Sequence, residues 1–217
     1  MAYAALPPEV TILLLGDADT GKSTFLSRLT LGIHPPPTTT EPEPEPLPPY
    51  TLPHLPATTQ PHTFNITLYA RPYRLHFYDT ASPTHYTLLN PDFIILCYDI
   101  SNRASLVSLR STWLPIVNEN FNADENLPVM VLGLKRDLRR QWRRTGGGDG
   151  AKGESVMPHE GVQLAQSMLC DLYAECSAQT GELCREVLED VARTCAKSTT
   201  VGGAKSQGFG GDGCVVM

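Results

Sequence analysis

The chain has 217 residues, of which 41% are hydrophobic and 18% charged, so it can form one globular domain with a buried core and extensions. Its net charge of −6 argues against nucleic acid as the main partner, because phosphate backbones are bound by clustered lysine and arginine. Six cysteines without CxxC spacing, no signal-peptide pattern and no apolar run near the roughly 20 residues of a membrane span predict a cytoplasmic chain with reduced thiols.

Apolar strand-like runs alternate with helix-length amphipathic segments, which is typical of a mostly parallel sheet with helices on both faces. The predicted strands are Val10–Leu15, Thr63–Ala70, Tyr73–Asp79, Phe93–Ile100, Val129–Gly133 and Leu172–Glu175. The predicted helices are Gly21–Leu31, Ala104–Glu119, Glu160–Leu169 and Glu182–Ala196. The second and third strands alternate with period two around "ARP", which predicts an antiparallel edge hairpin. We therefore expect an α/β domain over residues 1–196.

Three stretches interrupt this alternation. Residues 34–61 hold more than half of the 19 prolines, a composition that favours extended polyproline conformation and predicts a projecting loop that cannot pack a core. Its "PLPPYTLP" has PxxP spacing, which leaves two interpretations of the loop: a solvated insertion, or a ligand for an aromatic groove of another domain. Residues 139–157 combine a basic cluster with a glycine run and predict a solvated insert, and residues 197–217 predict a disordered tail.

The stretch "GDADTGKST" lies between the first strand and the first helix and has the spacing of a phosphate-binding loop. Its glycines let backbone N–H groups surround phosphates, and the helix N-terminus favours their negative charge. Lys22 reaches the terminal phosphates, and the Ser23 hydroxyl is a Mg²⁺ ligand. The predicted phosphate-binding residues are Gly16, Asp17, Ala18, Asp19, Thr20, Gly21, Lys22, Ser23 and Thr24.

Four later stretches narrow the class of nucleotide-binding protein: "YDTA" (78–81), "GLKRD" (133–137), "ECSAQT" (175–180) and the terminal "CVVM". Together they resemble the Ras-superfamily small GTPases. "TWLPIV" (112–117) and "MPHEG" (157–161) resemble stretches of the Rho branch. The resemblance covers about residues 8–196 with gaps. It implies the P-loop small-GTPase fold, with GTP or GDP and Mg²⁺ as ligands.

The resemblance also implies a base-binding site in two loops. Asp137 would accept hydrogen bonds from the guanine ring, while the stem of Lys135 packs over the base. Ser177 would support that aspartate, and the Ala178 backbone N–H would donate to the guanine oxygen. Gln179 belongs to the same loop.

For the metal, the resemblance implies that Asp79 acts through a bound water. A gapless count back from Asp79 puts Ala57 where the family has a metal-ligating threonine. A one-residue slip would restore that ligand as Thr58. The predicted metal residues are therefore Ser23, Thr58 and Asp79.

The departures from the family lie where hydrolysis happens. Ala18 replaces a glycine that makes room for a transition-state arginine, and Ser82-Pro83 replaces the family's Gly-Gln, whose glutamine orients the attacking water. The segment from Asp79 to Cys97, which holds the stretch known in the family as the second switch, is also short. This length predicts that the second switch has lost its helix. Leu134 replaces a polar residue that ties the base loop to the phosphate loop, at a cost on the order of 1–3 kcal/mol.

The tail "CVVM" fits a prenylation box with Cys214 as the acceptor. We expect a monomeric, atypical Rho-like protein that binds guanine nucleotide and signals to effectors from the cytoplasmic face of membranes, above all the plasma membrane. Regulatory proteins are its further expected partners, and poor GTP hydrolysis is expected. Two alternatives stay open: a conventional GTPase switch with substitute catalytic groups such as His85, or a scaffold that no longer binds nucleotide.

Overall fold

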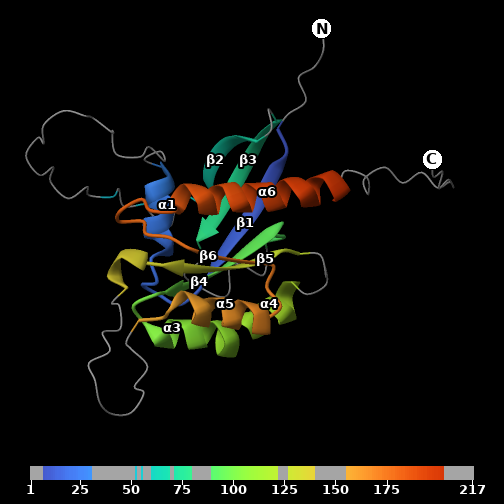
Figure 1. The fold of residues 1–217 in the computed structure, drawn as a ribbon. Helices are drawn as coiled ribbons and strands as arrows, with labels where there is room; N and C mark the ends of the chain where they lie inside the picture. Colours follow the sequence, from blue (N-terminus) through green and yellow to red (C-terminus); the bar gives the residue numbers. More distant parts are fainter. Residues whose placement is uncertain are drawn as a thin grey trace, which may run out of the picture.

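The computed structural model describes residues 7–30, 52, 55, 60–68, 71–79, 89–121, 127–139 and 155–202. Within them, six strands form one sheet in the order β2-β3-β1-β4-β5-β6 (Figure 1). The strands are β1 Glu9–Leu15, β2 His62–Leu68, β3 Arg71–Asp79, β4 Phe93–Asp99, β5 Val129–Leu134 and β6 Leu172–Glu175. Only the β2–β3 pair is antiparallel among the pairings of the described strands. The predicted mixed α/β sheet is therefore confirmed.

The described helices divide between the two faces of the sheet. They are α1 Lys22–Thr30, α3 Arg103–Ser108, α4 Leu114–Phe121, α5 Pro158–Ser167 and α6 Cys184–Gly202. Figure 1 shows α1 and α6 on one face and α3, α4 and α5 on the other. A π-helical turn, Leu109–Trp113, joins α3 to α4, and a 3₁₀ turn, Arg136–Leu138, follows β5.

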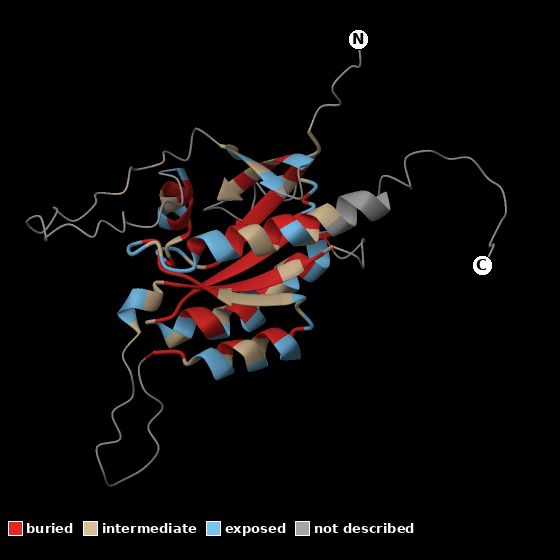
Figure 2. Ribbon diagram, turned by 45° about the horizontal axis from the view of Figure 1, so that its top comes forward, coloured by how far each residue is buried: buried red, intermediate tan, exposed pale blue. Residues whose placement is uncertain are grey.

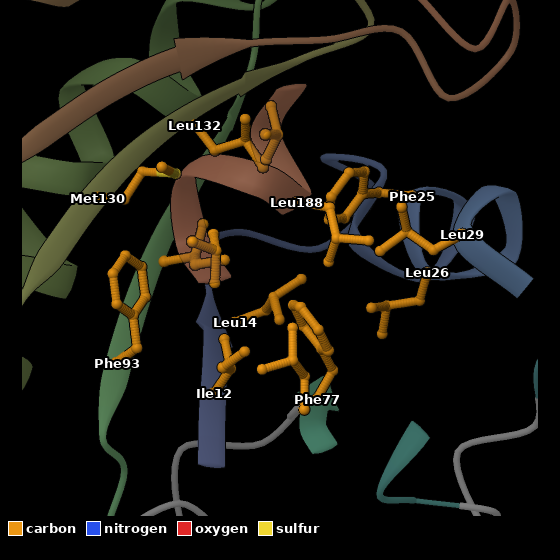
Figure 3. Packing of buried hydrophobic residues seen from close by; sticks show 14 of the residues in the cluster. Ile12, Leu14, Phe25, Leu26, Leu29, Phe77, Phe93, Met130, Leu132 and Leu188 are labelled. Atoms are coloured by element: carbon orange, nitrogen blue, oxygen red, sulfur yellow. The ribbon is translucent and has the colours of Figure 1, made fainter. Parts of the chain in front are cut away.

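Each face of the sheet has its own hydrophobic core, because successive side chains of a strand point to opposite faces. Ile12 and Leu14 of β1 pack under α1 and α6, whereas Leu13 and Leu15 pack under the helices of the other face. Figure 3 shows Leu14 beside Leu188 of α6. Figure 2 shows that the buried residues follow the central strands, as expected for a sheet covered on both sides.

The elements differ from their predicted bounds mainly at ends and at one interruption. The predicted helix over 104–119 is a single run made of α3, the π-helical turn and α4. α6 runs past residue 196 to Gly202, so the helix enters the stretch that we expected to be the disordered tail. Residues 203–217 lie outside the described residues.

One part of the proline-rich stretch packs where none was expected. Leu52 and Leu55 are partly buried and pack against the core cluster on the α1 and α6 face. The prediction that residues 34–61 cannot contribute to a core is therefore wrong at these two leucines. Composition favours an extended backbone there, but it does not decide where an individual apolar side chain lies.

None of the described helices is long and apolar enough to cross a membrane. The five described cysteines are free thiols: Cys97, Cys170, Cys176, Cys184 and Cys195.

Candidate functional site

The predicted site residues gather at one edge of the sheet. Gly16 follows β1, Asp79 ends β3, Lys135 follows β5 and Ser177 lies just beyond β6. These strands are parallel, so their carboxyl ends meet at the same edge. Open α/β sheets bind ligands at this edge.

The loop between β1 and α1 depends on backbone conformations that favour glycine. Gly16 has a φ of +147°, and a Cβ there would lie 2.2 Å from the carbonyl oxygen of Cys97 in β4. Gly21 has a φ of +104° and Asp19 a φ of +60°. Any side chain at Gly16 would push the loop off the sheet edge. The loop therefore owes its close curve to this position.

The Lys22 ammonium folds back over this loop. Its Nζ donates to the carbonyl oxygens of Gly16 at 2.9 Å and Asp17 at 2.8 Å, and only 7% of the residue is exposed. Lys22 is also the first residue of α1, where the backbone N–H groups have no partner within the helix. A cation and a helix N-terminus at the same loop favour an anionic group such as a phosphate.

The Asp17 carboxylate supports the loop and faces the helices of the other layer. Its Oδ1 accepts hydrogen bonds from Ser108 Oγ at 2.7 Å and from Trp113 Nε1 at 2.8 Å. Ser108 ends α3 and Trp113 ends the π-helical turn. Asp17, predicted as a phosphate-loop residue, thus uses its side chain to fix the loop to this helical run. Trp113 was noted in the sequence only as a Rho-like feature.

Two oxygen-bearing side chains meet beside the phosphate loop. The Ser23 hydroxyl donates a hydrogen bond to Asp79 Oδ2. The Gln60 side-chain amide donates to the Asp79 carbonyl oxygen. Hydroxyl and carboxylate oxygens are hard ligands of the kind that Mg²⁺ takes from proteins that bind phosphates, so this pair fits the implied metal.

On the other side of the site, the Lys135 ammonium joins three segments. Its Nζ donates to the carbonyl oxygen of Asp19 at 2.5 Å and to Asp99 Oδ2 at 2.8 Å. Lys135 has a φ of +58°, which directs the chain out of β5. Leu134 was expected to leave the base loop without its tie to the phosphate loop. The Lys135 contact supplies one such tie.

Asp137 is held by the residue that the family resemblance implies. Ser177 Oγ donates to Asp137 Oδ1 at 2.5 Å, and Ser177 is fully buried. Ser177 also anchors its own turn, because its Oγ accepts from the Thr180 backbone N–H at 3.1 Å. The Asp137 carboxylate is therefore oriented by a buried hydroxyl.

A cavity of about 290 Å³ lies between the phosphate loop helix and these two loops. Its walls are mainly apolar or backbone, with one carboxylate and one lysine stem. Such a cavity suits a planar ring that carries N–H donors for the carboxylate. The lining residues are Gly21, Thr24, Leu134, Lys135, Asp137, Leu138, Ala178 and Gln179.

Glu175 holds the chain segment that carries Asp137. Its carboxylate accepts from Arg139 Nη2 at 2.6 Å and from the Tyr173 hydroxyl at 2.5 Å, and Arg136 Nε lies 3.6 Å away. Arg139 also donates to the Val156 carbonyl oxygen at 3.1 Å. The prediction of a solvated segment from residue 139 is therefore wrong at Arg139, whose side chain is only 11% exposed. A buried carboxylate requires such partners.

A second ion pair fixes the start of α5 near the same insert. Arg103 Nη1 and Nη2 donate to Glu160 Oε1 at 2.8 Å and Oε2 at 2.7 Å, and Nη2 also donates to the Ser155 carbonyl oxygen. These hydrogen bonds lower the pKa of Glu160 to about 2. Glu160 Oε2 also accepts from the Met157 backbone N–H at 2.9 Å, which caps the helix.

Two buried cysteines lie near the site, Cys97 in β4 and Cys184 at the start of α6. Burial raises the pKa of the Cys97 thiol to about 12, so it stays neutral. The Cys184 thiol donates to the Ser177 carbonyl oxygen at 3.3 Å. At neutral pH, Cys97 therefore acts as a small packed side chain.

Sequence reasoning did not single out Arg28, Gln60, Asp99, Ser108 or Leu138, and it missed the role of Trp113. Asp99 was detectable, because "YDI" puts a carboxylate at the end of a strand that neighbours β5. Arg28 and Leu138 carry no such pattern. Among the predicted site residues, Thr58 and Cys214 lie outside the described residues, as do Ser82, Pro83 and His85.

Comparison with known proteins agrees with this geometry. Residues 55–197, well over half of the chain, match the Ras family profile. The human Rho-related GTP-binding protein RhoD is 27% identical over 202 residues, covering 88% of this chain and 84% of RhoD. The Rho-related GTP-binding protein RhoF is 26% identical in Homo sapiens and 27% in Mus musculus. Each RhoF alignment spans 195 residues, 87% of this chain and 82% of the relative.

Proposed function

We propose that this chain, which belongs to the Ras family and is a Rho-like small GTP-binding protein, retains guanine nucleotide with Mg²⁺ and hydrolyses GTP poorly. In this proposal it acts as a monomer and presents a nucleotide-stabilised surface to effector and regulatory proteins at the cytoplasmic face of membranes, the plasma membrane above all.

The contact that carries the proposal is the hydrogen bond from buried Ser177 to Asp137 at the edge of the cavity. One Asp137 oxygen is occupied by this hydroxyl, which fixes the carboxylate plane. A carboxylate so placed accepts paired N–H groups from one edge of a ring, as guanine presents and adenine does not. Lys135 and Leu138 would then cover the ring faces.

The phosphate half of the site assigns separate roles to Lys22, Ser23 and Asp79. The Lys22 ammonium lies on loop carbonyls 2.8 and 2.9 Å away, and would turn to the terminal phosphates of a bound nucleotide. Ser23 and Asp79 would hold Mg²⁺, which neutralises phosphate charge when bound. The hydrogen bond between them keeps both oxygens at one place.

Two departures from the family's sequence support the proposal of poor hydrolysis. Ala18 is exposed in the loop, where its methyl group takes the space of the family's glycine. Proline at position 83 can neither orient water nor donate a backbone hydrogen bond. Intrinsic hydrolysis by Ras is about 10⁻⁴ per second, and a partner's arginine adds up to about 10⁵-fold. A chain that lacks both the water-orienting glutamine and the space for a partner's arginine is expected to hydrolyse GTP slowly.

The membrane part of the proposal rests on the sequence of the tail. A farnesyl group on Cys214 would give only marginal, reversible binding, because one lipid chain is a weak anchor without a second signal. Replacing Cys214 with Ser is expected to move the protein wholly to the soluble fraction of a cell. An unchanged distribution would reject the anchor.

The central test is the nucleotide that the purified full-length protein carries. We expect chromatography of the extracted ligand to give GTP at close to one per chain. Bound GDP would instead favour a conventional switch that hydrolyses GTP with substitute groups such as His85. A protein without nucleotide that also fails to take up labelled GDP or GTP would reject the proposal and favour a scaffold.

A further inference from the structure

Arg28, in the last turn of α1, contacts the loop after β6. Its Nε donates to the carbonyl oxygen of Ala178 at 2.5 Å, and its Nη2 donates to that of Gln179 at 2.5 Å. α1 begins at Lys22, about 9 Å away along the helix axis. The helix α1 thus brings a cation to the phosphate loop at its start and another to the loop after β6 at its end.

The turn that Arg28 contacts is also closed by its own hydrogen bonds. The Gly181 N–H donates to the Ser177 carbonyl oxygen at 2.8 Å, and the Thr180 N–H donates to Ser177 Oγ at 3.1 Å. Gly181 has a φ of +83°, and a Cβ there would lie 3.9 Å from Arg28 Cδ. The arginine stem therefore lies against the outside of the turn.

These contacts form a continuous path from α1 to the base acceptor. In a trans peptide the C=O and N–H point in opposite directions, so the Gln179 carbonyl held by Arg28 sets the direction of the Thr180 N–H. That N–H donates to Ser177 Oγ, and the same hydroxyl donates to Asp137. Displacing the guanidinium loosens every step as far as the carboxylate.

We propose that Arg28 is a positioning residue for base recognition, which fixes the backbone of residues 178–180 and through it the Asp137 carboxylate. The inference rests on the proposed guanine-nucleotide function. Leu134, a buried hydrocarbon side chain, provides no polar tie where the chain leaves β5. Arg28 instead ties the loop after β6 to α1, through two charge-assisted hydrogen bonds.

The role predicts a change in base discrimination beyond any loss of affinity. GDP has an exocyclic amino group that donates to Asp137, whereas inosine diphosphate lacks it. We expect the wild-type protein to bind GDP more tightly than inosine diphosphate. In Arg28→Met, which removes both hydrogen bonds, the GDP affinity is expected to fall about tenfold, because Arg28 acts on the base only through the loop backbone. The affinity for inosine diphosphate should fall less, so the ratio of the two affinities shrinks.

The experiment is a titration of full-length protein with GDP and inosine diphosphate, with folding checked by circular dichroism and thermal melting. Arg28→Lys, which keeps a cation with fewer donors, should restore part of the ratio. Arg193→Met is the matched control, because Arg193 is exposed on α6 and, within the described part of the chain, forms its ion pair with nearby Asp190 at 2.8 Å. It should leave both affinities unchanged. If Arg28→Met does not fold, Arg28→Gln carries the same comparison.

The outcomes separate the two proposals. Saturable binding of both nucleotides by wild type, with a ratio that Arg28→Met leaves unchanged, overturns the role of Arg28 alone. An equal loss for both nucleotides also overturns it, because that result describes a general structural brace. Wild-type protein that binds neither nucleotide overturns the proposed function and this inference with it.

Discussion

The two halves of the site differ in how their residues are fixed. On the base side, Asp137 is held by Ser177, and Lys135 is held between Asp99 and the Asp19 carbonyl oxygen. On the phosphate side, Lys22 and Asp17 brace the loop equally well, but in our proposal Ala18 of that loop, and Ser82 and Pro83 in the sequence, replace the family's residues for hydrolysis. Holding a nucleotide and cleaving it are separate tasks of separate residues. A chain can therefore keep the first while losing most of the second.

Removal of the Lys22 ammonium is expected to lower nucleotide affinity more than any other change proposed for this site. Lys22→Ala takes away an ammonium that makes two charge-assisted hydrogen bonds to the loop and would meet the phosphates. We expect GDP and GTP affinities to fall at least about a hundredfold, measured by equilibrium titration. Retained affinity would show that the base side alone holds the nucleotide. Arg193→Ala serves as the control for loss of a positive charge.

Restoring the family's residues tests whether Ala18 and Pro83 are the cause of the slow GTP hydrolysis that we propose. In the double variant Ala18→Gly and Pro83→Gln, the methyl group is removed and a water-orienting amide returned. We expect single-turnover GTP hydrolysis to rise about tenfold, a change of about 1.4 kcal/mol in the barrier, with GDP affinity nearly unchanged. If the wild type already hydrolyses GTP at the rate of conventional relatives, the proposal that Ala18 and Pro83 impair hydrolysis is wrong.

A smaller effect is expected from the brace on the phosphate loop. Trp113→Phe removes the indole N–H that donates to Asp17, while Ser108 keeps its own hydrogen bond to the same oxygen. GDP should dissociate about threefold faster, since the Asp17 carboxylate loses one of these two hydrogen bonds and keeps the other. The preference for GDP over inosine diphosphate should stay as in wild type, in contrast to Arg28→Met. A changed preference would mean that the two halves are coupled through this helix.

The smallest effect concerns an ion pair that belongs to neither half. The pKa of Glu160 is about 2 in the folded protein, below its ordinary value of 4.5, because Arg103 hydrogen-bonds to the charged form. Its contribution to stability is therefore complete above pH 4.5 and is lost as the pH falls toward 2. Arg103→Met should flatten the dependence of the unfolding free energy on pH in that window.

Urea titrations at several pH values between 2 and 7 measure this slope. Nucleotide affinity at neutral pH should not change in Arg103→Met, because the pair joins α3 to α5 and does not line the cavity. A slope equal to that of wild type would show that the hydrogen bonds do not hold the Glu160 charge.

The sequence was sufficient for the sheet and for the backbone of the site. An apolar run such as "VTILLL" that is followed by a glycine-rich loop and a helix indicates a buried strand. The bounds of β1 and α1 were therefore predicted to within a residue or two. Ser177 and Asp137 were paired by family resemblance. Their contact at 2.5 Å depends on β5 and β6 being neighbours, which the sequence predicts only through the fold.

What could not be predicted depends on tertiary packing. Arg139 looked solvated because its neighbours are basic, yet the buried carboxylate of Glu175 requires it. Leu52 and Leu55 lie among prolines but find apolar surface on the core. Nothing in the local sequence singled out Arg28, whose partners are the Ala178 and Gln179 carbonyl oxygens. In each case the contacting residues are far apart in the sequence, so the local sequence pattern does not predict the contact.

The π-helical turn has a consequence for how the chain tolerates changes in length. A π turn accommodates one residue more than an α turn, which rotates every later side chain by about 100° relative to an unbroken α-helix. The indole of Trp113 meets Asp17 only in that phase. Deleting a single residue between α3 and α4 would therefore swing the indole away from Asp17 and leave Ser108 as the remaining one of these two donors, although no residue of the loop itself had changed.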